Sequence, residues 1–125
     1  MAQKQLSYYR YSVAGGDKGK QNRIMAATDP VRFDSYVIDV LMRDLIGHDK
    51  QPSAFLVYLL LHARSNAGET APSLSLRDIA ESTGLSKSVV QLALRTLIRR
   101  KLIAAKAAHR TAMRSYRVFR PWRRR

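Results

Sequence analysis

The sequence predicts a mainly helical domain that ends in a small β-hairpin. Apolar residues recur at helical spacing in several stretches between residues 34 and 100. A single glycine divides one of these stretches, "SLRDIAESTGLSKSVVQLALRTL" at residues 75–97, into two short helical patterns. Two stretches that suit paired strands follow, "LIAAK" at residues 102–106 and "SYRVF" at residues 115–119. The length of 125 residues is that of one domain.

The first 33 residues are predicted to form an N-terminal arm rather than part of the core. The stretch "AGGDKGKQN" at residues 14–22 has the composition of a turn or linker. Pro30 marks a boundary, because the residue before a proline avoids the helical region of backbone conformation.

An extra helix is predicted at residues 34–46. Val37, Leu41 and Leu45 recur every four residues and form one apolar face. Asp34 or Ser35 is suited to cap the start of this helix, and Gly47 to end it.

A buried central helix is predicted next. Pro52 suits the first turn of a helix. The stretch that follows it, "SAFLVYLLLHARSNAG", is apolar almost all round. Asn66 and Gly68 are suited to end this helix.

The glycine turn separates two helices with recognisable starts. Ser75 and Asp78 form a capping-box pattern at the start of the first. Gly84 stops that helix, because glycine adopts a left-handed conformation at little cost. Leu85 then points into the core, and Ser86 caps a helix that runs to about residue 100.

That last helix carries an apolar stripe, and the hairpin follows it. The stripe consists of Val90, Ala93, Leu94, Leu97 and Ile98. In the second strand, Tyr116 and Val118 are expected to face inward and Arg117 outward. The stretch "ETAPSLSL" before Arg77 is predicted to be a loop or a brief edge strand.

The charge distribution favours a polyanionic partner. The chain has 23 Lys and Arg against 9 Asp and Glu, a net charge of +14. No acid follows Glu81, and the last 44 residues carry 13 Lys and Arg. Nucleic acid is the expected partner. An anionic membrane surface is disfavoured, because no basic amphipathic helix ends in bulky apolar residues. The longest apolar run, "AFLVYLLL", is far shorter than the roughly 18 residues of a membrane span.

The residues that catalysis would need are absent or scattered, so we do not expect an enzyme or a cofactor. Cysteine is absent, and no two of the histidines, His48, His62 and His109, have metal-ligand spacing. The glycines of "AGGDKGK" lack the order of a phosphate-binding loop. The aspartates at positions 34, 39, 44 and 49 are five residues apart, a spacing that does not bring carboxylates together on an α-helix.

The helix, glycine turn, helix and hairpin resemble the winged helix-turn-helix domains of bacterial regulators of the GntR and MarR type. The pattern is carried by a small residue, Ala80, by Gly84, by the branched residues Val90 and Leu97, and by "RRKLIAA" at residues 99–105. The resemblance covers roughly residues 52–120, and a similar arrangement occurs in replication-initiation proteins of plasmids and phages. It divides the chain into an arm (1–33), a winged helix domain (34–120) with a helix-turn-helix (75–100) and a wing (102–119), and a basic tail (121–125).

The resemblance implies a set of DNA-contacting residues. On the recognition helix these are Ser86, Lys87, Ser88, Gln91, Leu92 and Arg95. Gln91 is the candidate for contacting adenine. Lys87 is expected to contact guanine or phosphate, Arg95 to contact phosphate, and Leu92 to touch a thymine methyl group or to pack on another part of the protein. Further candidates are Arg77, the wing residues His109, Arg110 and Arg114, and the tail arginines 120, 123, 124 and 125.

Two positions depart from the family pattern. Lys101 stands where a glycine usually follows the recognition helix. A left-handed conformation there costs on the order of 1 kcal/mol. The wing also lacks the usual glycine or Asn/Asp turn.

The implied function is sequence-specific binding of double-stranded DNA by a transcriptional regulator. The alternative is a replication-initiation protein, or another nucleoprotein-complex subunit whose winged helix contacts protein or RNA. A homodimer through residues 34–46, or a protein partner at those residues or at the arm, is part of the hypothesis. The N-terminal stretch has no apolar core of a secretory signal, so we expect a cytoplasmic, nucleoid-associated protein.

Overall fold

The computed structural model describes residues 27–65, 71–107 and 113–123. The chain divides into two units, Met1–Val31 and Arg32–Arg125. Of the first unit only residues 27–31 are described, and they include a turn. Every helix and strand reported below lies in the second unit.

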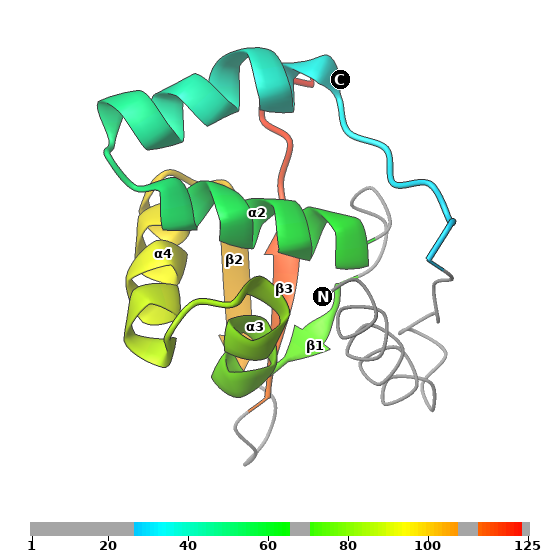
Figure 1. Cartoon of the computed structure of the whole chain (residues 1–125), viewed down its shortest axis with the longest axis vertical. Coiled ribbons are helices and arrows are strands. Elements are labelled where there is room, and N and C mark those ends of the chain that lie inside the picture. Colours follow the sequence, from blue (N-terminus) through cyan, green and yellow to red (C-terminus); the bar gives the residue numbers. More distant parts are fainter. Residues whose placement is uncertain (1–26, 66–70, 108–112, 124–125) are drawn as a thin grey trace. The chain divides into compact units, whose positions relative to one another are not determined.

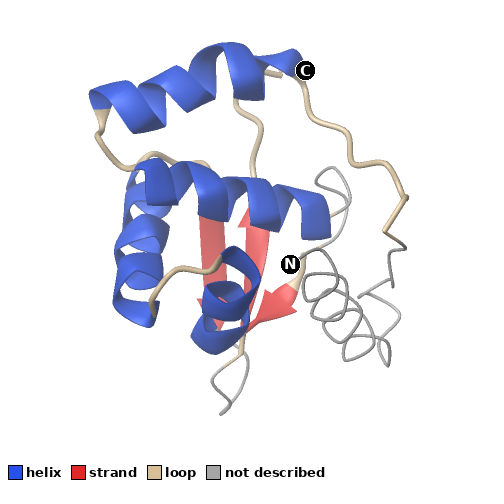
Figure 2. Ribbon diagram, in the orientation of Figure 1, coloured by secondary structure: helices blue, strands red, loops and turns tan. Residues whose placement is uncertain are grey.

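The described part of the chain is mainly helical, with a small antiparallel sheet in the order β1-β3-β2. The two N-terminal helical segments are η1 and η2. In Figures 1 and 2, α2 lies between these segments on one side and α3, α4 and the sheet on the other. The elements are η1 (Val37–Leu41), η2 (Arg43–His48), α2 (Pro52–Arg64), β1 (Ser73–Leu74), α3 (Leu76–Thr83), α4 (Lys87–Arg99), β2 (Ile103–Ala107) and β3 (Arg114–Val118).

The hairpin forms as the sequence predicts. Ile103 pairs with Val118 at one end of the β2–β3 ladder, and Ala107 pairs with Arg114 at the other. Tyr116 and Val118 are buried, whereas Arg117 is exposed. The stretch predicted as a loop or edge strand is the edge strand β1, which pairs with the start of β3.

The extra helix differs from the α-helix that the sequence predicts, because η1 and η2 are π-helical. The N–H of Met42 donates to the carbonyl of Val37, and that of Asp49 to the carbonyl of Asp44, five residues back. Val37, Leu41 and Leu45 are buried as predicted. Four-residue spacing keeps these side chains on one side in an α-helix as well, so it does not distinguish the two kinds of helix.

Two predicted ends of the extra helix are wrong. No side chain caps the start of η1. The carboxylate of Asp34 instead binds Trp122 and Arg123, and only its carbonyl accepts the N–H of Val37. Helical structure also continues through Gly47 to His48.

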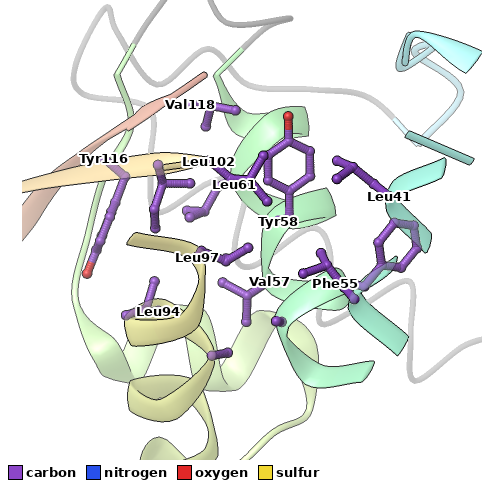
Figure 3. Close-up of a cluster of buried hydrophobic side chains, with 14 of the residues drawn as sticks. Leu41, Phe55, Val57, Tyr58, Leu61, Leu94, Leu97, Leu102, Tyr116 and Val118 are labelled. Carbon is purple, nitrogen blue, oxygen red and sulfur yellow. The ribbon is translucent and has the colours of Figure 1, made fainter. Parts of the chain in front are cut away.

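The core lies where α2 meets α4 and the sheet. Figure 3 shows Tyr58 and Leu61 of α2 beside Leu97 and Leu102. The hydroxyl of Tyr58 donates to the carbonyl of Phe119 at 3.0 Å, so the one polar end of this ring is satisfied. The central helix is not buried all round, since Leu56 is exposed.

The predicted caps of the helix-turn-helix are confirmed. The hydroxyl of Ser75 accepts the N–H of Asp78, and the Asp78 carboxylate accepts the N–H of Ser75, both at 3.0 Å. Gly84 has φ +83°, so the turn between α3 and α4 passes through the left-handed region that glycine tolerates. The hydroxyl of Ser86 accepts the N–H of Val89 at 3.2 Å and begins α4.

Lys101 adopts a left-handed conformation, with φ 59°. This agrees with the family pattern, which usually has a glycine at this position. Its N–H donates to the carbonyl of Ile98, and the N–H of Leu102 donates to that of Leu97. These two bonds form a Schellman motif, which usually places glycine at this position. A lysine here therefore carries backbone strain.

We expect Lys101→Gly to raise the free energy of unfolding by about 0.5 to 1 kcal/mol, because glycine removes the left-handed penalty but gains freedom in the unfolded chain. Urea unfolding measures the change. Lys101→Ala is the control, since it removes the charged side chain but keeps the Cβ. Equal stability of the two variants would contradict the explanation from strain.

His62 is a buried titratable side chain, as its position in an apolar helix predicts. It is 1% exposed, and its ring lies 4.9 Å from the Phe33 ring and 5.7 Å from the Tyr58 ring, between centroids. Neither ring nitrogen has a hydrogen-bond partner within the described residues. Burial lowers the pKa of His62, and the nearby positive charge of Arg120 lowers that pKa further.

We expect the protein to lose stability as the pH falls through about 6.5, the ordinary pKa of histidine. Below that pH the unfolded chain takes up a proton that the folded His62 resists, so acid favours unfolding. Urea unfolding at several pH values tests this. His62→Phe should flatten the dependence, and an unchanged dependence in this variant would contradict the explanation.

Candidate nucleic-acid interface

The last helix, α4, has two distinct faces. Its buried side is formed by Val90, Ala93, Leu94 and Leu97. The sequence places Ile98 in the same stripe, but it is 44% exposed, so the stripe is narrower than predicted. The spacing i, i+3, i+4 and i+7 places one set of exposed residues on a single face, which we call the α4 face: Ser88, Gln91, Leu92 and Arg95.

The start of α4 is exposed and carries no acid. Ser86, Lys87 and Ser88 are all exposed. The Ser86 hydroxyl caps the helix and lies 3.4 Å from the Ser88 hydroxyl. The free amides of a first turn and the positive end of the helix dipole favour an anion here.

Arg77, on α3, already has a partner. Its Nε lies 3.1 Å from Oε2 of Glu81, four residues later on the helix. Both side chains are largely exposed, so the pair adds little to stability. Its effect is to hold the Arg77 guanidinium beside the Glu81 carboxylate.

The wing lies at the same end of the domain as the start of α4. Figure 1 shows the end of β2, the start of β3 and the first turn of α4 at the lower end of the domain. Arg114, the first residue of β3, is exposed. His109 and Arg110 lie outside the described residues.

The described part of the tail lies at the other end of the domain. In Figure 1 the chain leaves β3 and runs to the N-terminal helical segments. The Trp122 ring stacks on the Tyr36 ring, with 4.6 Å between the ring centroids. The Nε1–H of Trp122 donates to Oδ2 of Asp34 at 2.7 Å. Arg123 donates to both carboxylate oxygens of Asp34, at 2.7 and 2.8 Å.

This clasp of Asp34, Trp122 and Arg123 changes the expectation for the tail. The hydrogen bonds from Arg123 and Trp122 lower the pKa of Asp34 to about 2, so the carboxylate stays charged and keeps Arg123 neutralised. The clasp therefore gives no support to the expectation that Arg123 grips DNA. Arg124 and Arg125 lie outside the described residues.

A pair of aspartates fixes the far end of α4. Arg100 binds Oδ2 of Asp44 at 3.0 Å and lies 3.6 Å from Oδ2 of Asp49. The sequence interpretation that five-residue spacing brings no carboxylates together is therefore wrong for these two. That interpretation assumed an α-helix, whereas the π-helical turn of η2 returns after about five residues.

Comparison with known families now decides the fold type. Residues 48–103 match a family described as a helix-turn-helix domain. The match covers α2, α3, α4 and the start of β2, and the hairpin β2–β3 supplies the wing. The domain is a winged helix-turn-helix. A winged helix-turn-helix indicates DNA as a partner. No curated protein matches the chain, and no solved structure matches it.

Metal sites and membrane-spanning helices are two other classes of feature that the described residues could form. No group of three or more His, Asp or Glu side chains there could hold a metal ion. Nor is any helix among the described residues long and apolar enough to cross a membrane.

Proposed function

We propose that the winged helix-turn-helix binds double-stranded DNA in a sequence-specific way and regulates transcription. The observation that carries this proposal is the α4 face, which is exposed over two turns and free of acids. A helix of this kind fits the major groove, where base edges are distinguishable.

The side chains of α4 suggest a division of labour. Gln91 has the amide that bonds adenine at two positions, and Lys87 has the charge to bond guanine or phosphate. Arg95 lies one turn further on and is suited to a backbone phosphate. Ser86 and Ser88 are suited to phosphate contacts beside the first-turn amides.

Phosphate contacts from α3 and the wing would fix the register of α4. Arg114 is exposed at the loop end of the β2–β3 hairpin, and His109 and Arg110 belong to the same proposal. Arg77 joins them if a phosphate displaces Glu81 from the ion pair at 3.1 Å.

Anisotropy titrations with a labelled random duplex test the proposal over about 50 to 200 mM salt. We expect Lys87→Ala to weaken binding and to lower the salt slope by about one. In selection of sites from a random pool, Gln91→Ala should relax sequence preference at one base pair, which is worth about 1–3 kcal/mol. Glu81→Gln should tighten binding, because it frees Arg77.

The same titrations include competitors. Single-stranded or duplex RNA that displaces the protein more effectively than duplex DNA of equal length would overturn the proposal in favour of an RNA-binding subunit. Binding that is absent, or that no change on α4 affects, would favour the alternative of a replication or nucleoprotein-complex subunit whose winged helix contacts protein.

We further propose that the N-terminal helical segments pair two copies of the chain. Their inner side is buried, yet Ile38 and Ile46 are exposed, at 49% and 38%. A two-fold contact would bury these side chains against the same patch of a second copy. Such a dimer would place two α4 helices on successive half-sites.

Sedimentation at micromolar concentration is expected to show a dimer that Ile38→Lys combined with Ile46→Lys converts to a monomer. The matched control is Leu92→Lys combined with Ile98→Lys, two exposed apolar positions of α4, which adds the same charge there and should leave the dimer intact. A monomeric wild type would contradict this part of the proposal.

A further inference from the structure

An exposed apolar side chain stands in the middle of the α4 face. Leu92 is 49% exposed. The sequence leaves two roles open for Leu92: touching a thymine methyl group, or packing onto another part of the protein. The described residues do not show Leu92 packed away from solvent. Val89, three residues earlier on the same side of the helix, is also exposed, at 36%. The helix thus presents an apolar edge to solvent.

The surroundings of this edge are polar and positive. Ser88, Gln91 and Arg95 share the face with Leu92, and Lys87 precedes it, all exposed. The helix contains no acid. A protein partner would have to leave these cations unpaired or supply acids for them. Duplex DNA supplies phosphates on both sides of a groove, which makes it the occupant that the charges fit.

One apolar group distinguishes base pairs in the major groove. It is the C5-methyl group of thymine, which lies beside the adenine edge of the same pair. Successive residues of an α-helix point about 100° apart. Gln91 and Leu92 therefore flank the line from Ser88 to Arg95, one on each side. On a helix seated in the major groove, side chains on the two sides of this line would reach neighbouring base pairs.

We propose that Gln91 and Leu92 together make this helix selective for consecutive A·T pairs. Gln91 bonds the adenine of one pair, and Leu92 covers the thymine methyl group of its neighbour. Val89 extends the apolar edge that excludes water from this methyl group. The proposal rests on the proposed function, because it assigns base chemistry to the same helix.

The test removes the methyl group from the DNA and the leucine from the protein. A duplex is first recovered with the wild-type chain by selection from a random pool. Each thymine in turn is then replaced by uracil, which lacks only the C5-methyl group. At one position we expect about a fourfold loss of wild-type affinity, the change for exposing one methyl group.

The decisive comparison combines the change in the protein with the change in the DNA. Leu92→Ala should bind the thymine duplex more weakly and should not distinguish uracil from thymine at that position. Ile98→Ala is the matched control, because Ile98 is an exposed apolar residue of the same helix more than one turn beyond Leu92. It should keep the wild-type response to uracil. Because Leu92 is 49% exposed and lies outside the core cluster, urea unfolding should show that the variant folds normally.

Failure of the inference is distinct from failure of the proposed function. If the wild type binds the selected duplex but responds to uracil at no position, the inference is overturned while DNA binding stands. The same follows if Leu92→Ala still responds to uracil, or if the selected sites contain no consecutive A·T pairs. If the wild type binds no duplex, both fall together.

Discussion

The packing of α4 beneath α2 is the constraint on which the rest of the domain depends. Val90, Ala93, Leu94 and Leu97 commit one side of α4 to the core. Because an α-helix repeats every 3.6 residues, burying this side fixes which residues face outward. The α4 face is therefore a consequence of the core, and a change that rotated α4 would remove Gln91 and Leu92 from its exposed side.

Contacts between neighbouring residues fix both ends of α4, and ion pairs with distant residues also hold its C-terminal end. Gly84 and Ser86 set its start through a left-handed turn and a hydroxyl cap. Lys101 and the ion pairs of Arg100 with Asp44 and Asp49 set its end. The N-terminal helical segments are thereby tied to the recognition helix, which is how a dimer contact on those segments would position α4 on DNA.

The domain has two ends of different character. The start of α4 and the loop end of the β2–β3 hairpin lie at one end (Figure 1). Lys87 and Arg114 are exposed there, and α4 contains no acid. At the other end Asp34 neutralises Arg123 and holds Trp122 against Tyr36. The high net charge of the sequence is therefore not spread evenly. Part of the cationic tail contributes to folding rather than standing free for a polyanion.

The sequence by itself determined the local features, because each depends on neighbouring residues. The capping box of Ser75 and Asp78, the turn at Gly84 and the strain at Lys101 could all be predicted from a few adjacent positions. Only the tertiary structure decided the contacts between distant residues. The convergence of Asp44 and Asp49 on Arg100, the clasp of Asp34 with Trp122, and the exposure of Leu92 and Ile98 depend on how whole elements pack, and on a π-helical turn that apolar spacing alone does not distinguish from an α-helical one.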